Sequence, residues 1–192
     1  MSAFSRAALA VLTAVIFTAD PAFAKSQDEL FLEAQKAFKN VQYATAIHAY
    51  EAAAAAAPAS DTALRAEYEI ARSFYYQWDI DTAITRFTDF VSKHSTHALA
   101  PRAQKWIGDA HVMKNRPDEA LTAYAALVRL YPGDALVAET KYAIGKIYAR
   151  KKEWQKAIEE FESVLSGQPS SWVVPQVKEA LKRAQEGLST GK

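Results

Sequence analysis

Hydrophobic and small residues recur along this chain with a step of 37 residues. Each copy has an alanine, an aliphatic residue directly after it, and an aromatic residue four positions after it. The marker alanines are Ala46, Ala83, Ala120 and Ala157. A small residue stands upstream of each marker at a constant offset, at Ala34, Ala71, Gly108 and Gly145. Because self-similarity at a fixed period is the signature of repeat architectures, the sequence predicts four copies of one unit stacked in a solenoid.

The spacing inside each unit predicts a helical hairpin. Apolar residues follow a helical period in two amphipathic segments that are separated by a short polar break. In the fourth unit these segments cover residues 135–151 and 154–166. The second segments open in register at Tyr43, Ile80, Pro117 and Trp154. Proline closes three of them because it is excluded from a helix interior, and Ser95 takes this place in the second unit. The closing prolines are Pro58, Pro132 and Pro169.

The small residues have a packing reason. A missing side chain at Gly145 lets the facing helix approach closely, and the marker alanine does the same from the other side. The change Ala120→Phe is therefore expected to overpack the hairpin and to cost about 1–3 kcal/mol or more.

The two ends of the stack differ from its middle. In the first unit, Glu33 and Ala37 stand where later units place apolar, aromatic or histidine residues. The second helix of the first unit runs through the alanines at 52–57. Such a unit is typical of a cap with one solvated face. The segment 172–188 predicts a last amphipathic helix, which we expect to cover the open end of the stack.

The first 24 residues predict a cleaved secretory signal peptide. Arg6 precedes an apolar run from Ala7 to Phe17, and Ala24 ends a small-residue stop. This run is shorter than the roughly 20 residues of a spanning helix, so we expect no membrane span after cleavage. The chain has no cysteine, which excludes disulfides, thiolate chemistry and lipid attachment through cysteine. We therefore expect a mature chain of residues 25–192 in the bacterial periplasm, or secreted.

Composition narrows the classes of partner. Half of the residues are hydrophobic, so the chain can bury a core without covalent staples. The net charge is +1, and it stays the same when residues 1–24 are removed. The chain lacks the basic excess of nucleic-acid-binding proteins, and we expect no nucleic acid partner.

Small, small, aromatic and proline residues at these offsets resemble the tetratricopeptide repeat over residues 27–171. The resemblance implies an all-α fold, a right-handed superhelical α-solenoid of four helical hairpins plus a C-terminal capping helix. The repeats would cover residues 27–60, 64–97, 101–134 and 138–171, and the capping helix 172–188. The step exceeds the usual 34 residues. In this it is similar to a periplasmic subgroup that includes the Tol–Pal-associated cell-division coordinator and the outer-membrane assembly lipoprotein.

The resemblance also implies a concave groove lined by the first helix of each unit. The matching positions carry seven cations and three anions together with aromatic residues, a mixture typical of protein-binding patches. We therefore expect an acidic peptide or protein segment as ligand. If these positions were ordinary helix surface, the tyrosines would instead pack against neighbouring units. The candidate groove residues are Phe31, Gln35, Phe38, Lys39, Arg65, Tyr68, Arg72, Tyr75, Tyr76, Arg102, Lys105, Met113, Tyr142, Lys146 and Arg150, with Asp28, Asp109, Val112, Glu139 and Ala149 at the remaining places.

No motif of a catalytic or metal-binding site stands in the sequence. His94 and His97 could offer two metal ligands, but no carboxylate follows at a fixed offset, and we interpret them as a solvated helix end. We interpret His111 as a packing residue, and the acidic run 159–162 as a solvated helix face. We therefore expect no cofactor, no metal and no enzymatic activity.

Three hypotheses of function remain. The main one is a non-enzymatic periplasmic scaffold that binds a partner protein in the groove and supports cell-envelope assembly or division. The second is a glycan-binding protein, because Tyr68, Tyr75 and Tyr76 could stack on the sugar rings of peptidoglycan. The third is a self-assembling array in which Trp172 and the last helix pack on another copy. Without such packing a monomer is favoured.

Overall fold

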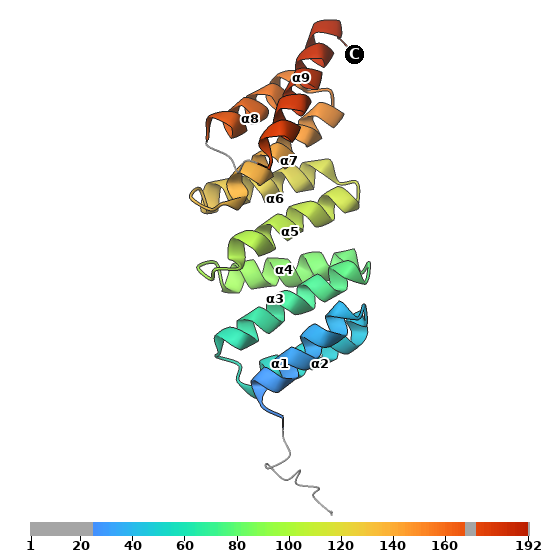
Figure 1. Ribbon diagram of the computed structural model, residues 1–192, viewed down its shortest axis with the longest axis vertical. Helices are drawn as coiled ribbons and strands as arrows, with labels where there is room; N and C mark the ends of the chain where they lie inside the picture. Colours follow the sequence, from blue (N-terminus) through green and yellow to red (C-terminus); the bar gives the residue numbers. More distant parts are fainter. Residues whose placement is uncertain (1–24, 168–171, 192) are drawn as a thin grey trace, which may run out of the picture.

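The computed structural model describes residues 25–167 and 172–191, and the signal-peptide prediction lies outside these residues. Within them the chain forms nine helices that follow one another along a single long axis, with α1 and α9 at opposite ends (Figure 1). Their bounds are α1 Gln27–Lys39, α2 Tyr43–Ala56, α3 Asp61–Tyr76, α4 Ile80–Lys93, α5 Ala100–Met113, α6 Pro117–Leu130, α7 Leu136–Arg150, α8 Trp154–Ser166 and α9 Val174–Thr190. Among the described residues, no helix has the length and apolar composition needed to cross a membrane.

The predicted all-α solenoid of hairpins is confirmed. The helices α2, α4, α6 and α8 begin at the four residues predicted to open the second helices. The last helix begins at Val174, two residues after the predicted start, and Pro175 lies in its first turn. Proline is tolerated there because the first N–H groups of a helix have no intrahelical partner.

In each of the four hairpins, one turn of the same backbone conformation joins the two helices. In each turn one residue has a positive φ, and these residues recur with the repeat at Val41, Trp78, Asn115 and Lys152. In the first turn the Gln42 N–H donates to the Ala37 carbonyl over 3.0 Å, and the other turns repeat this bond. This bond is the six-to-one hydrogen bond of a Schellman motif, which satisfies carbonyls at the end of the first helix. The repeat therefore extends to the backbone of the turns.

The core runs along the stack between the helices of each hairpin. All four marker alanines have no exposed surface. The aromatic residues that follow them are at most 2 % exposed, and they are Tyr50, Phe87, Tyr124 and Phe161. A Cβ atom added at Gly108 would lie 2.3 Å from the Tyr124 ring, and one at Gly145 would lie 2.4 Å from the Phe161 ring. The packing reason expected for the small residues is confirmed.

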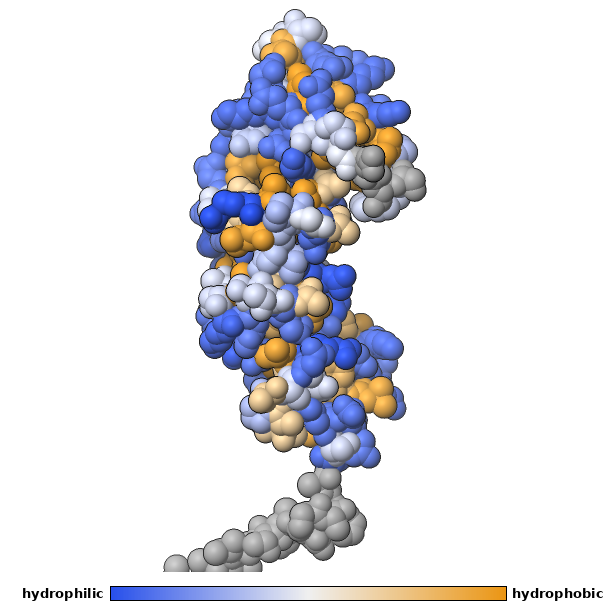
Figure 2. Space-filling model, turned by 90° about the vertical axis from the view of Figure 1, so that its left-hand side faces the viewer, coloured by the Kyte–Doolittle hydropathy of each residue, from blue (hydrophilic) through white to orange (hydrophobic). Residues whose placement is uncertain are grey.

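Each end of the stack is closed by contacts of its own. At the N-terminal end the Ser26 side chain forms a capping box with Glu29 at the start of α1. The Gln27 side-chain amide donates to the carbonyls of Ala53 and Ala57, which ties α1 to the end of α2. At the other end α9 buries Val177 and Ala184 in one cluster with residues of α8. Figure 2 shows one side of the stack, where hydrophobic side chains gather mostly in the half nearer to α9.

His94 lies at the end of α4, as interpreted from the sequence, but the interpretation that His94 and His97 are solvated is wrong. The His94 side chain is 24 % exposed and that of His97 14 %, and both rings pack near Phe90. His97 Nε2 lies 3.1 Å from Asp61 Oδ1, and His94 Nε2 lies 3.3 Å from Glu67 Oε2. The connection between α4 and α5 folds back on α3, and this tertiary contact covers the two rings.

Candidate functional site

A pocket of about 900 Å³ lies between α5, α7 and α9. The first helices of the third and fourth units form two of its walls, and α9 forms the third. Aromatic side chains from Tyr142, Trp154 and Trp172 line it together with charged residues. Trp172 is 57 % exposed, so a large apolar ring is presented to solvent at this site. Pockets of this size, mainly apolar with a few polar groups, are typical of ligand-binding sites.

The pocket gathers one part of the predicted groove. Six candidate groove residues line it, namely Tyr75, Lys105, Met113, Tyr142, Lys146 and Arg150. Nine others do not line it, namely Phe31, Gln35, Phe38, Lys39, Arg65, Tyr68, Arg72, Tyr76 and Arg102. Of the predicted groove, the pocket therefore includes residues of the third and fourth units and Tyr75 of the second.

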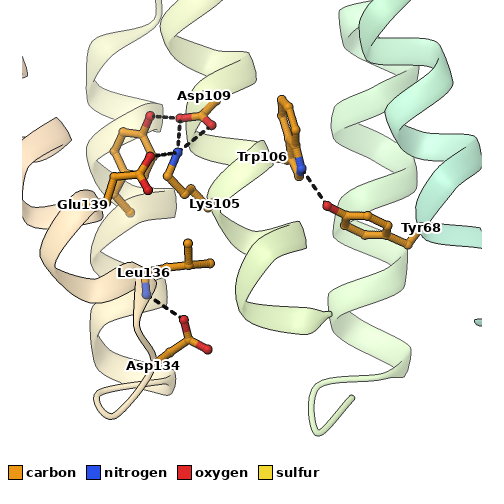
Figure 3. A network of polar contacts seen from close by, with 8 residues as sticks. Tyr68, Lys105, Trp106, Asp109, Asp134, Leu136 and Glu139 are labelled. Carbon is orange, nitrogen blue, oxygen red and sulfur yellow. Dashed lines mark hydrogen bonds and ion pairs between the residues drawn. The ribbon is translucent and has the colours of Figure 1, made fainter. Parts of the chain in front are cut away.

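The floor of the pocket holds a compact charge network. The Lys105 ammonium lies 3.0 Å from Asp109 Oδ2 and 3.0 Å from Glu139 Oε1, and its side chain is 16 % exposed (Figure 3). The Tyr124 hydroxyl donates to Asp109 Oδ1 over 2.5 Å. Burial lowers the pKa of Lys105, but the two carboxylates outweigh burial and raise it above its usual value. The two carboxylates therefore more than compensate the charge of Lys105, which offers no net positive charge to a ligand.

Two further cations of the pocket are not paired in this way. Lys146 and Arg150 of α7 line the pocket, and neither forms an ion pair with a residue that the structure describes. The Lys146 ammonium lies 4.6 Å from the centre of the Tyr142 ring. The pKa of Lys146 is lowered because the protein reduces its hydration and because Lys105 and Arg150 add like charge, which together outweigh the attraction of Asp109 and Glu139. These cations favour a bound anion.

Sequence reasoning missed the contribution of α9. Its residues Gln176, Glu179 and Arg183 line the pocket, and the Arg183 guanidinium pairs with Glu179 over 2.9 Å. The groove positions were derived from first helices alone, and a closing helix has no counterpart among them. The amphipathic pattern of 172–188 identified the buried side of this helix, but not the neighbour that its polar side faces.

Two candidate groove residues lie in the core instead of at the surface. Phe31 is 8 % exposed and Tyr68 3 %. The Phe31 ring packs edge-on against Tyr50, and the Tyr68 hydroxyl accepts a hydrogen bond of 2.8 Å from Trp106 Nε1 (Figure 3). Burial raises the pKa of Tyr68 to about 12. Both side chains thus lie beneath the groove surface instead of on it. Tyr68 packs against the neighbouring third unit, as expected if the groove positions were ordinary helix surface.

Five aromatic residues form a continuous series beside the pocket, which we call the aromatic ledge. It consists of Phe38, Tyr43, Tyr75, Tyr76 and Trp106, whose ring centroids lie 4.7–6.0 Å from their neighbours. Tyr75 also lines the pocket, so the ledge and the pocket are continuous. The sequence singled out Phe38, Tyr75 and Tyr76, but not Tyr43 and Trp106, which lie outside the groove positions of the repeat.

Comparisons with known proteins agree with this architecture. A tetratricopeptide repeat model matches residues 68–135. A crystal structure of MamA protein aligns with a TM-score of 0.65 over 85 % of this chain and 82 % of that chain, at 20 % identity. The fold is a tetratricopeptide repeat solenoid.

Two other solved structures have a similar fold. YrrB, described as a tetratricopeptide repeat protein with an unusual peptide-binding site, aligns with a TM-score of 0.59 at 20 % identity, over 80 % of this chain and 74 % of that chain. BtubC from P. vanneervenii aligns with a TM-score of 0.70 at 13 % identity, over 84 % and 72 %. No curated protein matches the sequence. At these identities the likeness is one of fold.

Proposed function

We propose that this protein is a non-enzymatic adaptor that binds an acidic segment of a partner protein in the pocket between α5, α7 and α9. One observation carries the proposal. Two cations, Lys146 and Arg150, stand without ion-pair partners among the described residues in a pocket with aromatic walls. Carboxylates of a partner would pair with them, and the rings would bury apolar parts of the same segment.

The charge network explains why binding depends on these two cations. Lys105 is held by Asp109 and Glu139, and Arg183 is held by Glu179. A carboxylate bound near Lys146 would favour its charged form and would raise its lowered pKa. The free energy of binding would thus include relief of the repulsion between Lys146 and its neighbouring cations.

A fluorescein-labelled peptide of glycine–serine pairs followed by four acidic residues tests this site. We expect Lys146→Glu combined with Arg150→Glu to weaken binding of the peptide more than tenfold, measured by fluorescence anisotropy, because it replaces attraction by repulsion. Lys178→Glu is the matched control, since Lys178 is exposed on α9 and does not line the pocket. Equal affinities of the pocket variant and the control would contradict the proposal.

A peptide ligand is favoured over a glycan by the structure of the groove. Of the three tyrosines considered for stacking on sugar rings, Tyr68 is buried in the core. Sedimentation with purified cell-wall sacculi separates the two classes of ligand. We expect the protein to stay in the supernatant, and cosedimentation that is lost in Tyr76→Ser would support the glycan instead.

We further propose that the adaptor is exported and serves cell-envelope assembly or division. The signal pattern of residues 1–24 supports this proposal. The mass of the protein purified from its native host should correspond to a chain that begins at Lys25. A mass that includes residues 1–24, or recovery of the protein only with the cytoplasm, would contradict it.

A further inference from the structure

We infer that the aromatic ledge is a second subsite for the same partner, and that it binds an extended, proline-rich apolar stretch next to the acidic segment. The inference rests on the proposed function, because the ledge continues into the pocket at Tyr75. A segment whose acidic end lies at Lys146 would therefore pass over the ledge if it continued toward the first unit.

The ledge presents ring surface that the protein itself does not cover. Tyr76 is 40 % exposed, and Phe38, Tyr43, Tyr75 and Trp106 are partly exposed. The hydroxyls of Tyr43 and Tyr75 form no hydrogen bond with any part of the chain that the structure describes. Each of the two hydroxyls can donate to a backbone carbonyl of a bound segment.

The charge of the ledge favours an apolar occupant. Arg72 lies 5.1 Å from the centre of the Phe38 ring and 5.9 Å from that of Tyr76, so it supports both rings. Its guanidinium is paired with Glu69 over 2.7 Å, and both side chains are mostly buried. The cation that stacks on these two rings is thus compensated, in contrast to Lys146 and Arg150 in the pocket. An acidic stretch would gain little at the ledge, whereas apolar rings would gain contact area.

The arrangement of the rings favours an extended occupant. The series crosses from the first unit at Phe38 through Tyr76 of the second to Trp106 of the third. Proline-rich segments form a polyproline II helix that has no internal hydrogen bonds and leaves its carbonyls free. Such helices dock on aromatic-lined grooves because little conformational entropy is lost. The ring faces of the ledge match the apolar surface of such a helix, and the free tyrosine hydroxyls match its free carbonyls.

Three labelled peptides test the inference with the full chain. The first is the glycine–serine peptide with four acidic residues. The second carries two proline–proline–valine triplets and the same four acidic residues, and it is made in two versions, with the triplets before or after the acidic residues. The third has the triplets alone. We expect the joined peptide, in one of the two orders, to bind about tenfold more tightly than the acidic peptide. Tyr76→Ser should remove this gain and leave the affinity for the acidic peptide unchanged. Leu130→Ser is the matched control, since Leu130 is 49 % exposed on α6, outside the ledge and the pocket.

The outcomes separate the two proposals. Equal affinities of the joined and acidic peptides for the unmodified protein, or a gain that survives Tyr76→Ser, would overturn the ledge and leave the pocket standing. If the acidic peptide does not bind while the triplets bind and depend on Tyr76, the pocket proposal fails and the ledge remains as a separate site. Failure of all three peptides to bind would overturn both. Circular dichroism melting of Tyr76→Ser checks that a loss of binding is not a loss of fold.

Discussion

Individual small residues set the distance between the two helices of a hairpin. Gly145 leaves room for the Phe161 ring, which has no exposed surface, and Gly108 leaves the same room for Tyr124. In the first two units Ala34 and Ala71 take the corresponding place and are also fully buried. In the third and fourth units, which form most of the pocket, the aromatic ring thus lies against helix backbone that carries no side chain.

Gly145→Ala is expected to destabilise the protein by up to about 2 kcal/mol. Alanine favours a helix over glycine by about 1 kcal/mol, but overpacking of a filled core costs about 1–3 kcal/mol, and the added Cβ atom would lie 2.4 Å from the enclosed Phe161 ring. Urea unfolding measures the change. Gly133→Ala is the control, because nothing lies within 4 Å of a Cβ atom added there. Equal midpoints for the two variants would contradict the packing account.

Lys146→Met is expected to raise the free energy of unfolding at neutral pH by less than about 1 kcal/mol, because an exposed ammonium is largely screened by solvent. The pKa of Lys146 is lowered in the folded state, so the charged lysine is less favourable there than in the unfolded chain. Stability of the unmodified protein should accordingly rise with pH between the folded and unfolded pKa values of this group. Thermal melts at pH 7 and above pH 9 measure both effects, and Lys178→Met provides the control. A lower melting temperature for Lys146→Met would show that its stem packing outweighs its charge.

At the scale of elements, the four turns inside the hairpins share one backbone but not one chemistry. The left-handed position is held by Asn115 and Lys152 in the later units and by Val41 and Trp78 in the earlier ones. Asparagine tolerates a positive φ, whereas a β-branched residue is strained there. Val41 is 67 % exposed and Trp78 75 %, so neither gains much by burial in the folded chain.

Val41→Asn is therefore expected to stabilise the protein by about 1 kcal/mol, because it removes the strain of a β-branched residue with φ near 63°. The reciprocal change Asn115→Val should destabilise it by a similar amount at the matching turn. Urea midpoints of the two variants and of their combination measure the effects, which should cancel at such separated sites. A fall in stability for Val41→Asn would show that the valine side chain has contacts in solution that its exposure does not predict.

At the scale of the whole molecule, the solenoid is a one-dimensional stack in which each unit packs on its neighbours. Stability then depends on nearest-neighbour contacts, and both ends need residues that close them. At the C-terminal end α9 covers Phe161 and Val164 of α8 and at the same time forms one wall of the pocket. Closure of the stack and formation of the pocket are therefore coupled.

Deletion of residues 172–192 is expected to lower the urea midpoint, to cause self-association and to weaken binding of the acidic peptide. Phe161 and Val164 are at most 1 % exposed and share one cluster with Val177 and Ala184 of α9, so the deletion would uncover part of this cluster. Multi-angle light scattering and anisotropy measure the changes, with a deletion of residues 189–192 as control. The intact protein should be a monomer in the same experiment. If it forms ordered oligomers that disappear in Trp172→Ser, α9 is an assembly surface, as the array hypothesis holds.

Most of the fold could be predicted from the sequence, because it follows from contacts that recur with the repeat. The step of 37 residues located the hairpins, and the starts of α2, α4, α6 and α8 followed from polar breaks and proline. The solvent exposure of single side chains could not be predicted in the same way. Phe31 and Tyr68 occupy groove positions of the repeat but are buried, and His94 and His97 are covered by a loop that folds back on α3.

The sequence by itself determined the period, the hairpins, the small positions where the facing helices approach closely and the amphipathic last helix, since these depend on local spacing. Only the tertiary structure decided which charges cancel and where a pocket opens. Glu139 reaches Lys105 from the following unit, and α9 crosses the stack to face α5 and α7. Both depend on the relative orientation of separate helices, which arises from the packing of all units together and has no signature in the spacing of any one of them.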